Sequence, residues 1–146
     1  MSHHLVLDTN IVLDTLVFRD PRTHPLQAAL FDNPVMPDLL WLATAPMREE
    51  LARVLAYPHI AVRLAFHGLQ AAQVLSHFDA RARIVPVAPK APATCKDPDD
   101  QKFIDLAVAR QALLLSKDRA VLSMTKRLTA WSVQAQPALP AFTPAP

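Results

Sequence analysis

Short apolar runs alternate along this chain with longer segments in which apolar residues recur at helical spacing. The apolar runs predict strands over residues 5–7, 39–42, 84–87, 113–115 and 131–133. The helical periodicity, interrupted by prolines and polar clusters, predicts helices over residues 11–18, 24–31, 47–56, 60–66, 69–78, 97–110 and 120–128. Asn10 is placed to cap the first of these helices, and Pro58 is expected to end the third.

Strands that alternate with helices in this way predict a three-layer α/β/α domain with a mostly parallel central sheet. We assign residues 1–136 to this domain and residues 137–146, which contain four prolines, to a proline-rich C-terminal tail. Ligands of such sheets bind beyond the carboxyl ends of the strands, where the strand order switches. Asp8 and Asp118 both follow predicted strands, so we expect the functional site at this edge.

The composition is that of one folded domain and excludes several classes of protein. Among 146 residues, 51% are hydrophobic and 19% are charged, which excludes a disordered chain. A single glycine, Gly68, excludes a P-loop and a dinucleotide-binding fold, because both need several glycines around phosphate. The apolar runs are shorter than the roughly 20 residues that span a bilayer. No leader sequence is evident and Cys95 is the single cysteine, so we expect a cytoplasmic protein without membrane contact.

Four carboxylates are flanked by apolar runs rather than by solvent-facing residues: Asp8, Glu50, Asp100 and Asp118. A buried carboxylate needs a base, a hydrogen-bond network or a metal to offset its charge. Few lysines or arginines stand in comparable positions, so the pattern favours a divalent cation. Oxygen ligands without histidine or cysteine suit Mg²⁺ or Mn²⁺ rather than zinc.

Each of these acids also has a purely structural interpretation. Asp8 and Asp118 can cap the helices that follow them, and Glu50 and Asp100 can stabilise the first turn of a helix. Asp97 can be a helix cap or an accessory site residue. Asp105 is expected on a solvated helix face. The basic residues near these acids can hold a phosphate backbone or form a solvated face: Lys96, Lys117, Arg119, Lys126 and Arg127.

Four sequence blocks resemble the PIN domain family, most closely the subgroup described as toxin components of bacterial toxin–antitoxin pairs. They are Leu-Val-Leu-Asp-Thr-Asn at 5–10, Glu-Glu-Leu-Ala-Arg-Val-Leu at 49–55, Asp-Pro-Asp-Asp-Gln-Lys-Phe at 97–103 and Leu-Leu-Ser-Lys-Asp at 114–118. The blocks occur in the order and spacing of the family, and the resemblance extends from residue 5 to about residue 135.

The resemblance implies a Mg²⁺- or Mn²⁺-dependent ribonuclease that is often a homodimer and often held by a small antitoxin. The acids of the family's site fall on Asp8, Glu50, Asp100 and Asp118. The resemblance further implies that Thr9 or Ser116 supports the site through its hydroxyl group and that Asn10 braces it.

The chain departs from the family pattern next to the last acid. Many relatives carry a further acid two residues after it, where this chain has Ala120. Relatives also tend to have Thr-Gly before it, where this chain has Ser116 and Lys117. The departure leaves open whether one or two metals bind. Lys117 is a candidate for occupying part of the place of the missing acid with its own charge.

We therefore predict a divalent-metal-dependent endoribonuclease that acts on RNA as a toxin. One alternative is a PIN-like module that binds nucleic acid or a partner without catalysis, which Ala120 favours. Another is a phosphatase with Asp8 as nucleophile, although Asn10 stands where that chemistry usually places a second aspartate.

Overall fold

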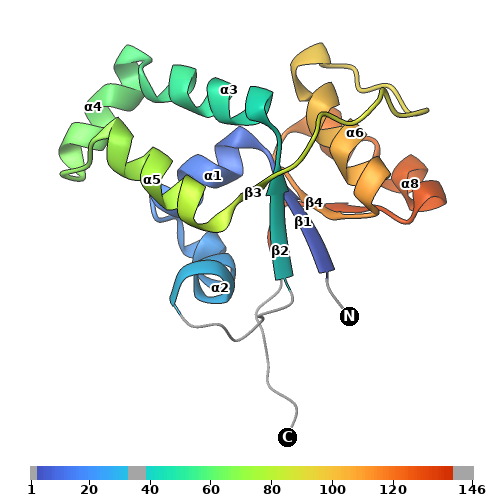
Figure 1. The fold of residues 1–146 in the computed structure, drawn as a ribbon, viewed down its shortest axis with the longest axis horizontal. Coiled ribbons are helices and arrows are strands. Elements are labelled where there is room, and N and C mark those ends of the chain that lie inside the picture. Colours follow the sequence, from blue (N-terminus) through green and yellow to red (C-terminus); the bar gives the residue numbers. More distant parts are fainter. Residues whose placement is uncertain (1–2, 33–38, 140–146) are drawn as a thin grey trace, which may run out of the picture.

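A five-stranded, all-parallel sheet forms the centre of the structure, a computed structural model that describes residues 3–32 and 39–139 (Figure 1). The strands are β1 (His3–Leu7), β2 (Leu39–Ala43), β3 (Arg83–Ile84), β4 (Leu113–Leu115) and β5 (Gln134–Gln136). Their order in the sheet is β3-β2-β1-β4-β5. The predicted α/β class with a parallel sheet is confirmed.

Helices cover both faces of this sheet, with α1 to α5 on one side and α6 and α8 on the other (Figure 1). The α-helices are α1 (Thr9–Leu16), α2 (His24–Gln27), α3 (Ala45–Leu55), α4 (Pro58–Phe66), α5 (Ala71–Arg81), α6 (Gln101–Arg110), α7 (Arg119–Leu122) and α8 (Thr125–Leu128). Single turns of other helix types are η1 (Pro21–Thr23), η2 (Ala28–Asp32), η3 (Pro98–Asp100) and η4 (Thr129–Trp131). No helix in the described ranges has the length and apolar character needed to cross a membrane.

The strand order switches between β1 and β4. From β1 the chain proceeds through β2 to β3 on one side, and it then returns across the sheet to add β4 and β5 on the other. Leu7 is paired with Leu115, and the next residue, Asp8, donates its backbone N–H to the carbonyl oxygen of Leu115 at 3.1 Å. The loops after β1 and β4 therefore leave the sheet side by side, where ligands of parallel sheets bind.

The apolar runs of the sequence form the interior. Leu5 and Val6 of β1 and Leu114 and Leu115 of β4 are fully buried, and Ile104 of α6 packs in the same core without exposure. Burying each such side chain contributes about 1.5–3 kcal/mol. The two neighbouring strands that are followed by candidate acids, β1 and β4, are thus anchored in the core of the domain.

Two details of the predicted elements are wrong. The fifth strand is Gln134–Gln136 rather than residues 131–133, because η4 occupies Thr129–Trp131 and Ser132 has a left-handed backbone with φ of 61°. The helix predicted over 120–128 is two short helices, α7 and α8. The helix predicted to end before Pro58 does so: α3 stops at Leu55, Tyr57 is extended as expected of the residue before a proline, and Pro58 then begins α4, where a missing N–H is tolerated.

The strand predicted over 84–87 is short, since β3 covers only Arg83–Ile84. It lies at the edge of the sheet, and Pro86, which has no N–H to donate, is outside the ladder as expected. The proposed division between a domain and a tail stays a prediction, and most of that tail, residues 140–146, lies outside the described residues.

Candidate metal centre

Asp8 leaves β1 as a buried carboxylate with a hydrogen-bond donor on each oxygen. Its Oδ1 accepts the backbone N–H of Ile11 at 3.0 Å, and its Oδ2 accepts the hydroxyl of Ser116. Asp8 is therefore the N-cap of α1, and the prediction that Asn10 caps this helix is wrong. The Asn10 side chain is exposed and does not cap α1. Burial raises the pKa of Asp8, while its hydrogen bonds with Ser116 and Ile11 oppose the rise.

Ser116 connects the ends of β1 and β4. Its fully buried hydroxyl donates to Asp8, and the same oxygen accepts the backbone N–H of Asp118 at 3.0 Å. Asp118 in turn caps α7, with Oδ1 accepting the N–H of Ala120 at 2.8 Å. This chain of hydrogen bonds fixes the two strand-end aspartates relative to each other. An accessory role of Ser116 in the site stays a prediction.

Asp97 and Asp100 reach the same place from η3. Asp97 caps this turn by accepting the N–H of Asp99 at 3.0 Å. One carboxylate oxygen from each of Asp97, Asp100 and Asp118 lies within 4.8 Å of the others, and we call these three residues the aspartate cluster. The sequence predicted that Asp97 is either a helix cap or an accessory site residue. In the structure Asp97 caps η3 and also belongs to this cluster.

Asp100 is the least satisfied member of the aspartate cluster. Its Oδ2 is the one buried side-chain nitrogen or oxygen without a hydrogen-bond partner within the described ranges. Burial, followed by the charges of Asp118 and Asp97, raises the pKa of Asp100 to about 7. A hydrogen bond between the carboxyl groups of Asp100 and Asp118 requires a proton on one of them, so the fully ionised cluster has no internal donor.

Glu50 lies beside the aspartate cluster but is held differently. One of its oxygens accepts the hydroxyl of Thr9, and Oε1 is 3.0 Å from the ammonium nitrogen of Lys102. Asp8 and Glu50 do not belong to the set of mutually close oxygens. All the same, a cavity of about 130 Å³, here called the site cavity, is lined by Asp8, Thr9, Asn10, Glu50, Val54, Asp100 and Phe103.

The structure thus brings the four predicted acids to one edge of the sheet and adds Asp97 to them. Whether each of them binds a metal stays a prediction. The comparison with protein families bears on the chemistry: residues 4–120 match the family model described as PIN domain. This chain belongs to the PIN domain family. A search of curated proteins gives no match. PIN domains are generally metal-dependent nucleases, and the aspartate cluster is a possible metal site of this one.

Lys117 is not a free cation beside the aspartate cluster of this PIN domain. Its ammonium group forms an ion pair with Asp14, a carboxylate that is 6% exposed and lies on α1. The idea that Lys117 balances charge in place of an acid at Ala120 is therefore not supported by its position. The ion pair instead ties the loop that carries Asp118 to α1.

Two of the other basic residues expected to hold a phosphate backbone, Lys96 and Arg119, are exposed. Each is the immediate neighbour of a member of the aspartate cluster, and neither forms an ion pair within the described ranges. Asp105, expected on a solvated face, is instead partly buried and accepts the N–H of Ala91 at 2.8 Å, which holds the loop before η3.

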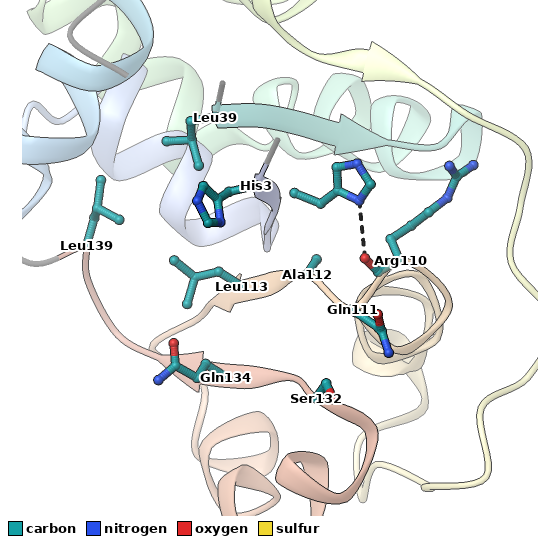
Figure 2. A pocket seen from close by; sticks show the side chains of 10 residues that line it. His3, Leu39, Arg110, Gln111, Ala112, Leu113, Ser132, Gln134 and Leu139 are labelled. Atoms are coloured by element: carbon teal, nitrogen blue, oxygen red, sulfur yellow. Dashed lines mark hydrogen bonds between the residues drawn. The ribbon is translucent and has the colours of Figure 1, made fainter. Parts of the chain in front are cut away.

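A larger cavity of about 520 Å³ lies at the opposite, amino-terminal edge of the sheet (Figure 2). His3, Leu39, Leu113 and Gln134 come from the starts of four strands and surround it. No aspartate or glutamate lines this cavity among the described residues, so its chemistry does not fit a hard divalent cation.

Lys102, which contacts Glu50 at the site cavity, is a residue that the sequence did not predict. It is separated from Glu50 by 52 positions, and only the packing of α6 against the rest of the site brings the two together. No local pattern marks this pair. The one available signal was its position two residues after Asp100 in the block Asp-Pro-Asp-Asp-Gln-Lys-Phe.

Proposed function

We propose that this PIN domain is a divalent-metal-dependent endoribonuclease that hydrolyses RNA phosphodiesters. The observation that carries the proposal is the buried, unpartnered Oδ2 of Asp100 within a cluster of three aspartates. Such an arrangement is unfavourable for the protein alone, because three carboxylates repel one another in a partly desolvated place. It becomes favourable when a cation offsets the charge.

The donor set fits Mg²⁺ or Mn²⁺. Carboxylate oxygens are the ligands that these ions prefer, and no histidine or cysteine belongs to the cluster. Asp97, Asp100 and Asp118 would hold the ion, with Asp8 beside them on the buried side. A bound divalent cation supplies Lewis-acid activation of water and offsets the negative charge that develops on the phosphodiester.

The surrounding residues have supporting tasks in this proposal. Ser116 orients Asp8 and the backbone of Asp118 through two hydrogen bonds. Lys96 and Arg119, exposed and next in sequence to Asp97 and Asp118, would attract the RNA backbone. Binding that depends on such contacts weakens as salt rises, because counterions are released from the RNA.

A biological role as a toxin, neutralised by a small antitoxin, belongs to the same proposal, as does a homodimer. Large apolar side chains on α4 support association with another protein: Val62 is 68% exposed and Phe66 is 82% exposed. An exposed pair of this kind, four residues apart on one helix, is typical of a surface that another chain covers. Loss of self-association in Phe66→Ser, measured by light scattering, would support the homodimer.

A circular single-stranded RNA and its DNA counterpart test the proposed activity. An endoribonuclease linearises the RNA circle in Mn²⁺ and leaves the DNA circle intact. Cleavage confined to the ends of linear RNA would show an exonuclease, and equal cleavage of both circles would show a nuclease without preference for RNA.

A second candidate is a PIN domain that binds RNA or a partner without cleaving. Ala120 favours it, because it carries no carboxylate at the position where many relatives have a further acid. Metal-dependent cleavage that is lost in Asp100→Asn would rule this candidate out, whereas RNA binding without cleavage in any divalent ion would favour it.

A further inference from the structure

One fixed positive charge lies at the rim of the site cavity. Lys102, in the first turn of α6, places Nζ 3.0 Å from Glu50 Oε1 and 2.5 Å from the carbonyl oxygen of Asp99. The same ammonium lies 4.9 Å from the centre of the Phe103 ring. Glu50 and Phe103 both line the site cavity, so these contacts hold the ammonium at its edge.

The negative charge of Glu50 is balanced by a lysine, unlike the charges of the aspartate cluster. Both of its oxygens already accept a hydrogen bond, one from Thr9 and one from Lys102, and the ammonium balances the carboxylate. The Glu50 side chain is 16% exposed, so this pair is screened little by solvent. A cation bound to Glu50 would have to compete with the ammonium, whereas Oδ2 of Asp100 has no donor to displace.

We infer that Lys102 binds a phosphate oxygen of the RNA backbone and that Glu50 positions this lysine instead of binding the cation. The inference rests on the proposed function. An ammonium group has three N–H donors, and the hydrogen bonds within the described ranges use two of them. The third is available to a phosphodiester oxygen that enters the site cavity.

The two hydrogen bonds of Lys102, to Glu50 and to the carbonyl oxygen of Asp99, also explain why this lysine is suited to binding a phosphate. An unrestrained lysine loses roughly 1–2 kcal/mol of side-chain conformational freedom when it is fixed. Lys102 is already fixed by Glu50 and Asp99 before RNA arrives, so less freedom is lost on binding. Its charge further reduces the repulsion between the RNA phosphates and the carboxylates of the site.

Two binding measurements that need no turnover test the inference. Mn²⁺ binding is measured by calorimetry for the wild type, Glu50→Gln and Asp100→Asn. We expect Glu50→Gln to bind Mn²⁺ within about threefold of the wild type, since Glu50 is not a ligand. Asp100→Asn should bind at least about tenfold more weakly, as expected when a ligand is lost.

RNA binding is measured by fluorescence anisotropy of a labelled single-stranded RNA in EDTA, over a series of salt concentrations. Lys102→Met should weaken binding about tenfold or more, the value of one charge-assisted hydrogen bond, and should reduce the salt slope by about 0.7. Lys102→Arg keeps the charge and should restore most of the affinity. Arg110→Met removes a charge from the far end of the same helix and should change neither quantity appreciably.

Different failures identify different errors. Equal Mn²⁺ losses in Glu50→Gln and Asp100→Asn would make Glu50 a ligand and overturn the inference. So would a Lys102→Met variant that binds RNA like Arg110→Met. Intact Mn²⁺ and RNA binding with no cleavage would contradict the proposed function alone, because the roles of Lys102 and Glu50 in binding would still stand.

Discussion

Replacing Asp100 by asparagine removes a negative charge from the place where the structure provides no hydrogen-bond donor for it. We expect this substitution to stabilise the metal-free protein. The pKa of Asp100 is raised from the ordinary 3.8 to about 7, first by burial and then by its acidic neighbours. One pKa unit corresponds to about 1.4 kcal/mol, so the ionised residue destabilises the fold by at most about 4 kcal/mol. Asp100 is only partly buried, and solvent screening reduces this to about 1–2 kcal/mol.

The pH dependence has a definite sign. The unfolded chain releases the Asp100 proton near pH 3.8 and the folded chain near pH 7, so between these values the folded chain holds more protons. The wild type therefore loses stability as the pH rises from about 4 to about 7. The advantage of Asp100→Asn should be small at pH 4, grow through this range and remain constant above about pH 7.5.

The assay is urea unfolding in EDTA at several pH values, followed by the same series in Mn²⁺. At pH 8 the variant should exceed the wild type by about 1–2 kcal/mol in EDTA. Mn²⁺ at 100 times its dissociation constant stabilises the wild type by about 2.7 kcal/mol and should shrink or remove the advantage of the variant, which binds Mn²⁺ more weakly. Asp99→Asn, at the exposed neighbouring position, is the control and should change neither result. A variant less stable than the wild type at pH 8 in EDTA would refute the reasoning and make Asp100 a stabilising first-turn acid.

Three further predictions follow from the hydrogen bonds and charges of the site. Asp8→Asn keeps an oxygen for the cap of α1 and should retain the wild-type unfolding free energy within about 1 kcal/mol while abolishing cleavage; Asp8→Ala, which loses the cap, should cost about 1–2 kcal/mol in urea unfolding. Ser116→Ala leaves the Asp8 carboxylate without the hydroxyl that donates to it and the Asp118 N–H without its acceptor, and it should lower the unfolding free energy by about 1–3 kcal/mol. The exposed Ser123→Ala should lower it by less than about 0.5 kcal/mol. The apparent Mn²⁺ affinity should rise with pH up to about 7 and then level off, because the Asp100 proton must leave before its carboxylate binds; a calorimetric affinity that is flat from pH 5.5 to 8 would contradict this.

The central part of the fold could be predicted from the sequence because its strands are buried on both faces. The runs at residues 5–7, 39–42 and 113–115 are continuously apolar, and the structure has strands at all three places. Since parallel strands end at the same edge, the positions of Asp8 and Asp118 after two of these runs also followed from the pattern.

The edge of the sheet could not be predicted in the same way. β5 has the sequence Gln-Ala-Gln, and it joins the sheet through backbone hydrogen bonds to β4 rather than through an apolar pattern. The more apolar Trp131-Ser132-Val133 next to it suggested a strand, but the left-handed backbone of Ser132 excludes one there.

The pairings within the site depend on tertiary packing. The ion pairs of Lys102 with Glu50 and of Lys117 with Asp14 join segments that are far apart in the sequence. Local spacing carries no information on either pair. It therefore identified Glu50 but not Lys102, the lysine that neutralises it, and it named Lys117 without its partner Asp14.

The central claim is that the aspartate cluster binds a divalent cation on which RNA cleavage depends. The most direct measurement is cleavage of a mixed RNA panel by the purified protein in Mn²⁺, Mg²⁺ or EDTA, beside Asp100→Asn and Asp99→Asn. We predict cleavage in Mn²⁺ or Mg²⁺ and none in EDTA, with loss of activity in Asp100→Asn and retention in Asp99→Asn. Cleavage that persists in EDTA or in Asp100→Asn would contradict the claim, as would the absence of both cleavage and Mn²⁺ binding in the wild type.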